Sequence, residues 1–571
     1  MIAVNKNNHY IKNIINEMTL DQKVGALLTL GFSGTLVRPH IYDYVTKYHC
    51  GGLRLTPHAR TFGNYVDPKS GKTVVHVADD KGYKKGIGAP YATASEYKQT
   101  LDELQALGMN RPLGIPLHFS YDQEGGTSAD FNFGGVNLFT KPMGIRATGD
   151  SKLAYEVAKA VSRQSRAVGF NWIHSPVLDI NIEPKNPEIY TRAYSDVAEE
   201  VAEYSEQSCI GFKEGGLIAT GKHFPGRGDS AVDAHFEMPV INVDKETMLK
   251  RELLPYKVLI EKGVLPSIMI AHSIFPAIDD EHIATVSKKV ITGLLREELG
   301  FEGVITTDSM TMGAIAVRYG VANACAMSLE AGADLVLMKA ENSLVDETFN
   351  TIKRFVEEGR ITQEELDRKV YRVLNTKYEY GLFHQGNITD QKPEEVIADE
   401  KMVFLSKLVA RKSVLVAKDE KGMLPLDKKE KILVVEQINK TPNNMSWHPG
   451  ILFKNCIKYN HNVSYLETAY TFDEQDKENI KIKIKDFDKV IITNFFIRGK
   501  LANSDFVDEI IKENPQKVVV VSNTPYELSI PARAEAVIVT FATTPHNIEV
   551  VAGTLFGTMT PEGQWPITHQ I

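Results

Sequence analysis

The chain has 571 residues, more than a single ordinary hydrophobic core serves, so we expect two domains. It is 43% hydrophobic and 24% charged, which is typical of a globular protein, and no apolar run approaches the roughly 18 residues of a membrane-spanning helix. The net charge of −8 argues against general affinity for nucleic acids or acidic membranes, so we expect neither as a partner.

The cysteines are few and dispersed, with no CxxC pair: Cys50, Cys209, Cys325 and Cys456. Four scattered thiols fit a reducing compartment better than a disulfide-stapled fold. The first 25 residues lack an apolar signal core followed by a small-residue cleavage site. We therefore expect a cytoplasmic protein whose cysteines are buried thiols.

Short apolar runs alternate with amphipathic stretches over the first two thirds of the chain. The eight runs lie at 24–32, 51–56, 116–123, 171–180, 217–223, 266–273, 303–309 and 333–339. They are rich in Ile, Leu and Val and mostly do not alternate with polar residues, as is typical of parallel strands buried on both faces. Eight strand–helix units predict a (β/α)8 barrel of the TIM type. The polar insertion at 57–92 lines the active-site mouth or is a surface loop without function; both interpretations are open.

A second α/β domain is predicted after two further helices, at 343–359 and 362–380. Its apolar runs lie at 431–437, 488–496, 517–525 and 535–543, and a late helix is expected at 546–557. The uneven polar stretch 384–402 is interpreted as a linker. The predicted organisation is thus a catalytic TIM barrel at 1–383 and a smaller α/β sandwich at 403–571.

Polar residues follow several of the predicted barrel strands: Asp122, Glu124, Asp179, Arg192, Lys222, His223, His272 and Asp308. The carboxyl ends of barrel strands carry the reactive side chains in enzymes of this architecture. Acids, bases and hydrogen-bonding groups suited to a sugar are therefore expected on one face. Asp308, at the end of "GVITTDS", can be a nucleophile, base or metal ligand, or equally the N-cap of the next helix.

The stretch "GKHFPGRGDSAVDAH" at 221–235 places six ionisable side chains among three glycines and a proline, which predicts a loop. Asp233 lies two residues before His235, a spacing at which an aspartate can orient a histidine ring for proton exchange. A solvated loop pair is the alternative. So is a metal site, although no recognised ligand spacing such as HExxH is present. The plausible ligands are His223, Asp229, Asp233, His235 and His272.

Four motifs in this order resemble glycoside hydrolase family 3, specifically its β-N-acetylglucosaminidase branch. They are "YDQEGG", "HSPVLDIN" with "NPEIYTRAYS", "GKHFPGRGDSAVDAH" and "GVITTDSMTMGAI". The segments 410–426 and 553–567 resemble the opening and closing segments of the family's second domain, so the resemblance covers nearly the whole chain.

The resemblance assigns a role to each site residue. Asp308 resembles the nucleophile that forms a covalent glycosyl-enzyme, His235 resembles the general acid/base, and Asp233 resembles its orienting partner. The residues that resemble those holding the sugar in the −1 pocket are Asp122, Arg192, Lys222 and His223. The implied activity is retaining, exo-acting hydrolysis of terminal β-linked GlcNAc from short glycans or glycosides, with a small carbohydrate substrate and without a metal or other cofactor.

The chain departs from the branch after "DQEGG", where Thr127 and Asp130 replace the usual basic residues. If Asp130 faces the aglycone, neutral glycosides should be preferred to acidic ones. Three alternatives stay open: a β-N-acetylglucosaminide phosphorylase, a β-glucosidase-type hydrolase of the same family, and a non-catalytic sugar-binding barrel. Gly226 and Gly228 further predict a mobile loop at 224–236 that closes over the substrate.

Overall fold

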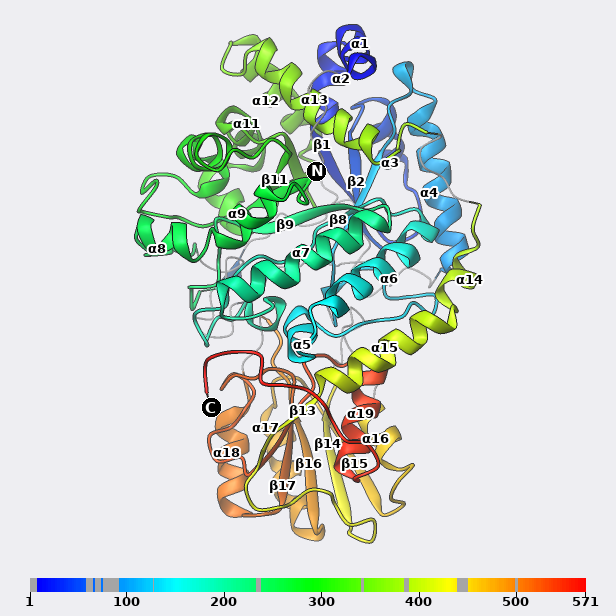
Figure 1. Cartoon of the computed structure of the whole chain (residues 1–571), viewed down its shortest axis with the longest axis vertical. Coiled ribbons are helices and arrows are strands. Elements are labelled where there is room, and N and C mark those ends of the chain that lie inside the picture. The colour runs from blue at the N-terminus through cyan, green and yellow to red at the C-terminus, as the bar shows by residue number, and fades with distance from the viewer. Residues whose placement is uncertain are drawn as a thin grey trace.

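The protein consists of a barrel domain and a smaller sheet domain stacked along the long axis of the molecule (Figure 1). The computed structural model describes residues 8–57, 65–66, 73–74, 92–126, 128–232, 238–339, 343–384, 390–438, 450–498 and 502–570. The predicted insertion at 57–92 therefore lies almost wholly outside the described residues. Only the short antiparallel pair β3 (Tyr65–Val66) and β4 (Thr73–Val74) is described there.

Eight parallel strands close into the predicted barrel, in the order β1-β12-β11-β10-β9-β8-β5-β2. They are β1 (Leu28–Ser33), β2 (Gly52–Thr56), β5 (His118–Tyr121), β8 (Trp172–Ile173), β9 (Ile218–Phe224), β10 (Ser267–Ile270), β11 (Val304–Ser309) and β12 (Leu335–Met338). Nearly every residue of these strands is buried, which explains why their sequences read as continuous apolar runs. The prediction of a TIM-type barrel is confirmed.

Helices surround the barrel and return the chain from one strand to the next (Figure 1). They begin and end with recognisable signals: capping boxes start α4 at Thr93 and α13 at Thr362, and α6 ends at left-handed Gly169. The helices of the barrel domain are α1 (His9–Glu17), α2 (Leu20–Ala26), α3 (Pro39–Thr46), α4 (Ala94–Met109), α5 (Pro142–Ala147), α6 (Lys152–Val168), α7 (Ala198–Glu214), α8 (Lys245–Lys250), α9 (Leu254–Glu261), the π-helix η4 (Lys289–Glu298), α10 (Gly313–Tyr319), α11 (Val321–Ala331), α12 (Val345–Glu357) and α13 (Gln363–Glu379).

The second domain is a six-stranded sheet with helices on both faces. Its strands, in sheet order, are β13 (Leu415–Asp419), β18 (Ala536–Val539), β17 (Val518–Ser522), β16 (Lys489–Asn494), β14 (Ile432–Gln437) and β15 (Val463–Thr468). All pairs are parallel except β13 with β18. Separate buried clusters fill the two faces, one under α17 (Glu474–Lys483) and α18 (Ser504–Glu513) and one under α16 (Ile451–Cys456) and α19 (Pro545–Leu555).

The two domains are held together by a helix and by the last described residues. After α14 (Pro393–Ile397), helix α15 (Glu400–Ser413) packs against α5 and α6 of the barrel and against α19 of the sheet domain. The last described residues bond to the barrel domain. Ser195 Oγ donates to the carbonyl oxygen of Pro566 at 3.0 Å, and Thr568 N donates to Asp196 Oδ2 at 2.8 Å. The sheet domain therefore contacts the end of the segment between β8 and α7.

None of the helices in the described part of the chain is both long and apolar enough to cross a membrane. All four cysteines are buried free thiols, and burial raises the pKa of Cys50 to about 11. Neutral buried thiols of this kind act as small core residues.

Candidate active site

The predicted polar residues converge at the carboxyl ends of the barrel strands. Asp122 follows β5, Lys222 and His223 belong to the end of β9, and Asp308 is the penultimate residue of β11. Because parallel strands end on the same face of a barrel, these side chains share its mouth. Lys222 and His223 are both buried there, and the peptide bond that joins them is cis.

Asp122 is held by three cations, from strands β2 and β9 and from the residue that follows β12. Lys222 Nζ lies 2.9 Å from its Oδ1, Lys339 Nζ lies 3.1 Å from its Oδ2, and Arg54 also bonds to Oδ2. Burial alone would raise the pKa of Asp122, but the charges of Arg54, Lys222 and Lys339 outweigh it and hold the pKa well below its usual value. Asp122 is thus a permanent carboxylate, and its side chain is 22% exposed and can accept from a ligand hydroxyl.

Glu124 pairs with Arg192 on the same face. Arg192 Nε and Nη2 lie 2.7 and 2.9 Å from the two carboxylate oxygens, a bidentate arrangement, and Lys222 Nζ lies 2.6 Å from Oε1. Burial raises the pKa of Glu124, but Arg192 and Lys222 more than offset this and hold it at about 2. Most of the hydrogen-bonding capacity of Arg192 is therefore spent on orienting Glu124, and its side chain is only 10% exposed.

His223 is oriented by Asp179, which the sequence had placed at the end of the neighbouring strand. His223 Nδ1 lies 2.7 Å from Asp179 Oδ2, and its Nε2 lies 3.5 Å from Arg192 Nη2. Burial and the nearby charges of Arg227 and Arg192 lower the pKa of His223 well below its usual value. Since arginine can only donate, Nδ1–H of the neutral ring donates to Asp179, and Nε2 is left as an acceptor.

Asp308 lies beside a buried arginine that sequence reasoning did not single out. Arg227 Nη2 lies 3.6 Å from Asp308 Oδ2 and 3.2 Å from Glu188 Oε1. The Asp308 side chain is 17% exposed, whereas Arg227 and Glu188 are each 3% exposed. Asp308 Oδ1 also accepts from the amide of Ser309 at 2.7 Å, so its carboxylate is fixed at the strand end. The alternative role of Asp308 as an N-cap finds no support in the helix that follows, because α10 begins after Met312.

The second domain reaches this group. Arg498, in the segment after β16, places Nη1 3.5 Å from Glu188 Oε1, the same oxygen that Arg227 contacts. Arg498 is 39% exposed, and Phe496 from the same segment packs edge-on against Tyr190 of the barrel at 5.3 Å. A cation of the sheet domain thus stands two side chains away from Asp308.

Asp130, which replaces a basic residue of the resembled branch, does not face open space. It is 1% exposed, and its Oδ2 lies 2.5 Å from Arg54 Nη2 and 2.8 Å from the amide of Asp122. The condition under which it would repel acidic aglycones is therefore not met. Thr127 lies outside the described residues.

The predicted catalytic pair, Asp233 and His235, lies outside the described residues, so both assignments stay predictions. The preceding part of the loop is fastened to the barrel: Arg227 N donates to Asp179 Oδ1 at 2.7 Å. A Cβ added to Gly228 would lie 1.5 Å from the carbonyl oxygen of Ile180, so this glycine permits a close approach rather than motion. Gly226, with φ of 144°, does need the conformational freedom of glycine.

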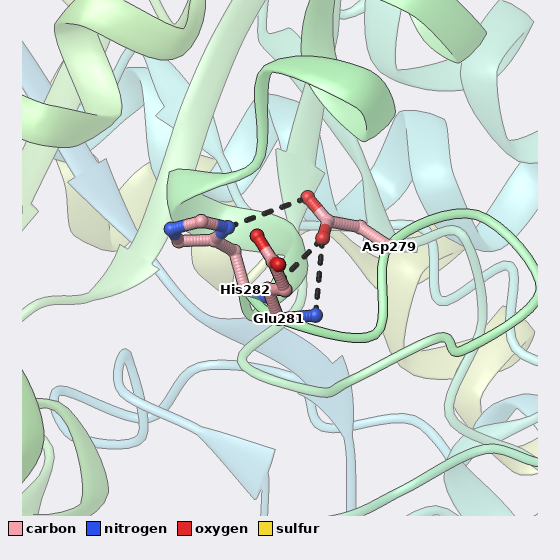
Figure 2. A group of neighbouring side chains, drawn as sticks. All are labelled: Asp279, Glu281 and His282. Carbon is pink, nitrogen blue, oxygen red and sulfur yellow. Dashed lines mark hydrogen bonds and ion pairs between the residues drawn. The ribbon is translucent and has the colours of Figure 1, made fainter.

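The described members of the suggested metal site are not brought together. His223 bonds to Asp179, Asp229 to Arg251 at 2.7 Å, and His272 to Thr285 and the carbonyl of Ser309. Within the described ranges, one other group has ligand-like proximity: Asp279, Glu281 and His282 (Figure 2). Asp279 already accepts from Ser287 Oγ at 2.6 Å and from two backbone amides, which makes this group a turn-stabilising cluster.

Two residues of the site, Arg54 and Lys339, lie in predicted strands and are charged, and this charge is itself a signal of a site. Arg54 is a charged residue inside the apolar run "GGLRLT", and Lys339 ends the run "ADLVLMK". A charge at such a position is costly to bury without a partner, so it indicates a site facing the barrel interior or mouth. The assembled group can grip a polyhydroxylated ring and present one carboxylate, Asp308, to it.

Comparisons with known proteins agree with this arrangement. The family described as "Glycosyl hydrolase family 3 N terminal domain" matches residues 19–376. Beta-hexosaminidase A of Pseudoalteromonas piscicida is 30% identical over 295 residues, which are 48% of this chain and 49% of that protein. The chain thus spans about half the length of this relative.

Two solved structures share the architecture. A glycoside hydrolase family 3 beta-N-acetylglucosaminidase from Paenibacillus sp. superimposes with a TM-score of 0.83 at 28% identity, over 96% of this chain and 99% of that chain. A beta-glucoside phosphorylase shares the fold with a TM-score of 0.81 at 21% identity, over 99% of this chain and 97% of that chain. Because the family match covers more than half of the 571 residues and includes the whole barrel, the chain belongs to glycoside hydrolase family 3.

Proposed function

We propose that the protein is a retaining, exo-acting β-N-acetylglucosaminidase that releases terminal β-linked GlcNAc from short glycans or glycosides. The observation that carries the proposal is the placement of Asp308, a partly exposed carboxylate beside the Arg227 guanidinium, at the same barrel mouth as the cation-held Asp122. The names of the β-hexosaminidase relative and of the β-N-acetylglucosaminidase structure support the choice of sugar.

The proposed reaction has two steps. Asp308 attacks the anomeric carbon while His235, oriented by Asp233, protonates the leaving glycosidic oxygen, so that one C–O bond forms as the other breaks. In the second step His235 takes a proton from water, which displaces Asp308 and releases the sugar with its original β configuration. Asp122, Lys222 and His223 bind the ring hydroxyls. Arg192 supports this group by orienting Glu124.

The test is product analysis with p-nitrophenyl β-glycosides of GlcNAc and glucose, followed by ¹H NMR at early times. We expect turnover of the GlcNAc glycoside, a preference for it over the glucoside, and initial release of β-GlcNAc. Initial release of the α-anomer would contradict the retaining mechanism. A preference for the glucoside would support the β-glucosidase-type alternative, and binding without any turnover would support a non-catalytic barrel.

A phosphorylase is the second candidate function. Cations near the proposed nucleophile support it because they would attract a phosphate anion. Arg227 lies beside Asp308, and Arg498 contacts the Glu188 carboxylate that Arg227 shares. A neutral histidine also repels phosphate less than a carboxylate would. Phosphate would then replace water in the second step and leave GlcNAc 1-phosphate. Repeating the assay with and without inorganic phosphate, and measuring GlcNAc 1-phosphate against free GlcNAc, separates the two activities.

We also propose a cellular compartment and the limits of the domains. We place the protein in the cytoplasm because its four dispersed cysteines are buried thiols. The catalytic domain is taken as 1–383, the linker as 384–402 and the sandwich domain as 403–571. Helix α15 joins the last two segments, since it runs from Glu400 to Ser413.

A further inference from the structure

The geometry points to Arg54 as a positioning residue for the sugar-binding carboxylate Asp122, with Asp130 as its counter-charge. This inference rests on the proposed function, because Asp122 is taken to bind the sugar. One guanidinium nitrogen is shared: Arg54 Nη2 donates to Oδ2 of Asp122 and, at 2.5 Å, to Oδ2 of Asp130. The same Asp130 oxygen accepts from the amide of Asp122 at 2.8 Å.

The pair grips Asp122 from two directions. Arg54 holds its side chain from strand β2, while Asp130 holds its backbone amide from the segment after β7 (Ser128–Ala129). Arg54 itself is anchored by a bond from Nη1 to the carbonyl oxygen of Leu55, and it is fully buried. The orientation of Asp122 is thus set by groups that do not reach the ligand, which is how a supporting shell fixes a binding residue.

An arginine and an aspartate at these two places are not explained by packing. A buried ion pair is often no more stable than apolar residues of the same volume, so its presence at a barrel position indicates a use beyond stability. The sequence adds a second indication, because Asp130 stands where the resembled branch carries a basic residue. In this chain Arg54 of β2 contacts Asp122, and position 130 supplies the counter-ion of that arginine.

The charge of Asp122 depends on this pair as well. Arg54 is the largest of the charges that hold its pKa below the usual value, against the effect of burial. The charged and titratable groups around Asp122 are Arg54, Lys222, Lys339, His174, Glu124 and Asp130. Removing Arg54 while keeping Lys222 and Lys339 should raise the pKa and leave the carboxylate free to turn toward Lys222.

The experiment uses the whole 571-residue chain and three variants. R54M alone leaves Asp130 buried without its partner, so R54M/D130L, which replaces both by apolar side chains, is the main variant. R54M/D130R moves the guanidinium from position 54 to position 130. R296M is the matched control: Arg296 forms a comparably buried pair with Asp334 and bonds to two backbone carbonyls, and Asp334 precedes β12 rather than following it.

We expect R54M/D130L to raise KM for p-nitrophenyl β-GlcNAc, and the Kd for GlcNAc measured by calorimetry, at least tenfold, with a smaller change in kcat. The acidic limb of the pH profile of kcat/KM should move to higher pH, because loss of Arg54 raises the pKa of Asp122. R54M/D130R should recover most of the lost affinity. R296M should lower Tm while leaving KM and the acidic limb unchanged.

A folded R54M/D130L protein with unchanged KM, Kd and acidic limb would overturn the inference and reduce Arg54 to a structural role. The same holds if R296M changes KM as much as R54M/D130L does. Failure of the proposed function looks different, since the wild-type protein would then not turn over the glycoside. In that case the calorimetric comparison of GlcNAc binding still decides the role of Arg54, and absence of GlcNAc binding by the wild type would overturn it.

Discussion

Arg227 Nη2 lies 3.6 Å from Asp308 Oδ2, and this guanidinium is shared with the buried carboxylate of Glu188. Within the described part of the chain, Nε and Nη1 of Arg227 are buried and have no hydrogen-bond partner. The side chain is therefore held mainly by charge, between one buried acid and the acid at the mouth. Its positive charge faces the carboxylate that we propose as the nucleophile.

Replacing Asp308 by Asn should abolish most turnover. Without the carboxylate no glycosyl-enzyme can form, so kcat for p-nitrophenyl β-GlcNAc should fall by about three orders of magnitude or more, as after removal of other covalent nucleophiles. Steady-state kinetics and the Tm of the variant provide the measurement and the folding control. A folded variant that keeps more than a tenth of the wild-type kcat would show that Asp308 is not the nucleophile.

Arg227→Met should lower kcat roughly 10- to 100-fold with little change in KM, because the lost interaction is with the proposed nucleophile rather than with the ring hydroxyls. Arg227→Lys should recover part of the loss, since a lysine restores the charge but not the guanidinium geometry. Equal losses in Arg227→Met and Arg227→Lys, together with a raised KM, would indicate that the residue only shapes the loop.

Replacing His235 by Gly should harm substrates according to their leaving groups. Poor leaving groups need protonation, so turnover of chitobiose should drop far more than that of the activated p-nitrophenyl glycoside. The ratio of the two kcat/KM values, compared with the wild type, measures this. If both substrates lose the same factor, a structural role for His235 is the better explanation.

Arg498→Ala should affect acidic aglycones selectively. A partly exposed charge pair contributes at most about 1 kcal/mol, so kcat/KM for a GlcNAc–anhydro-muramic acid disaccharide should fall about three- to fivefold while chitobiose is unaffected. Arg411→Ala is the control, because Arg411 is similarly exposed and pairs with Glu562 in the second domain. Parallel changes with both disaccharides would place Arg498 outside the aglycone site.

The Asp179 carboxyl group should add a pH dependence to stability that is opposite in sign to that of His223, whose pKa is lowered. Burial raises the pKa of Asp179 to about 6, against the opposing charges of Arg227 and Arg192, and an unfolded aspartate titrates near ~3.9. The folded state therefore binds the proton more tightly, and the associated stability is present below pH ~4 and lost as pH rises through about 6.

Asp179→Asn removes this titration, so the Tm of the variant relative to the wild type should rise between pH ~4 and about 6 and level off at higher pH. The slope is at most about 1.4 kcal/mol per pH unit. Thermal melts of both proteins across this range provide the measurement. A Tm difference that does not vary with pH would contradict the assignment of the raised pKa to Asp179.

The sequence predicted the barrel strands because each is buried on both faces and reads as an apolar run. It missed β13 and β15, the two edge strands of the second sheet, because edge strands are partly exposed and their sequences, such as "VSYLET" at Val463–Thr468, mix polar and apolar residues. The barrel strands are almost fully buried and the edge strands are not, and a continuous apolar run in the sequence marks only a strand that is buried on both faces.

The site was predictable to the extent that strand ends identify it. Asp122, Lys222, His223 and Asp308 were found in this way and do converge. Arg54 and Arg227 were not, because their roles depend on partners far along the chain: 76 residues separate Arg54 from Asp130. No local pattern encodes such a pairing.

The contact between Tyr190 and Phe496 connects the second domain to the proposed sugar site. Tyr190 opens the 3-10 turn Tyr190–Arg192, and the residues just beyond that turn are tied to Pro566 and Thr568. Arg192 is thus carried on a short turn braced by a different domain. Natural variation at Phe496 or in 564–570 could retune the affinity for the sugar without altering a single residue that touches it.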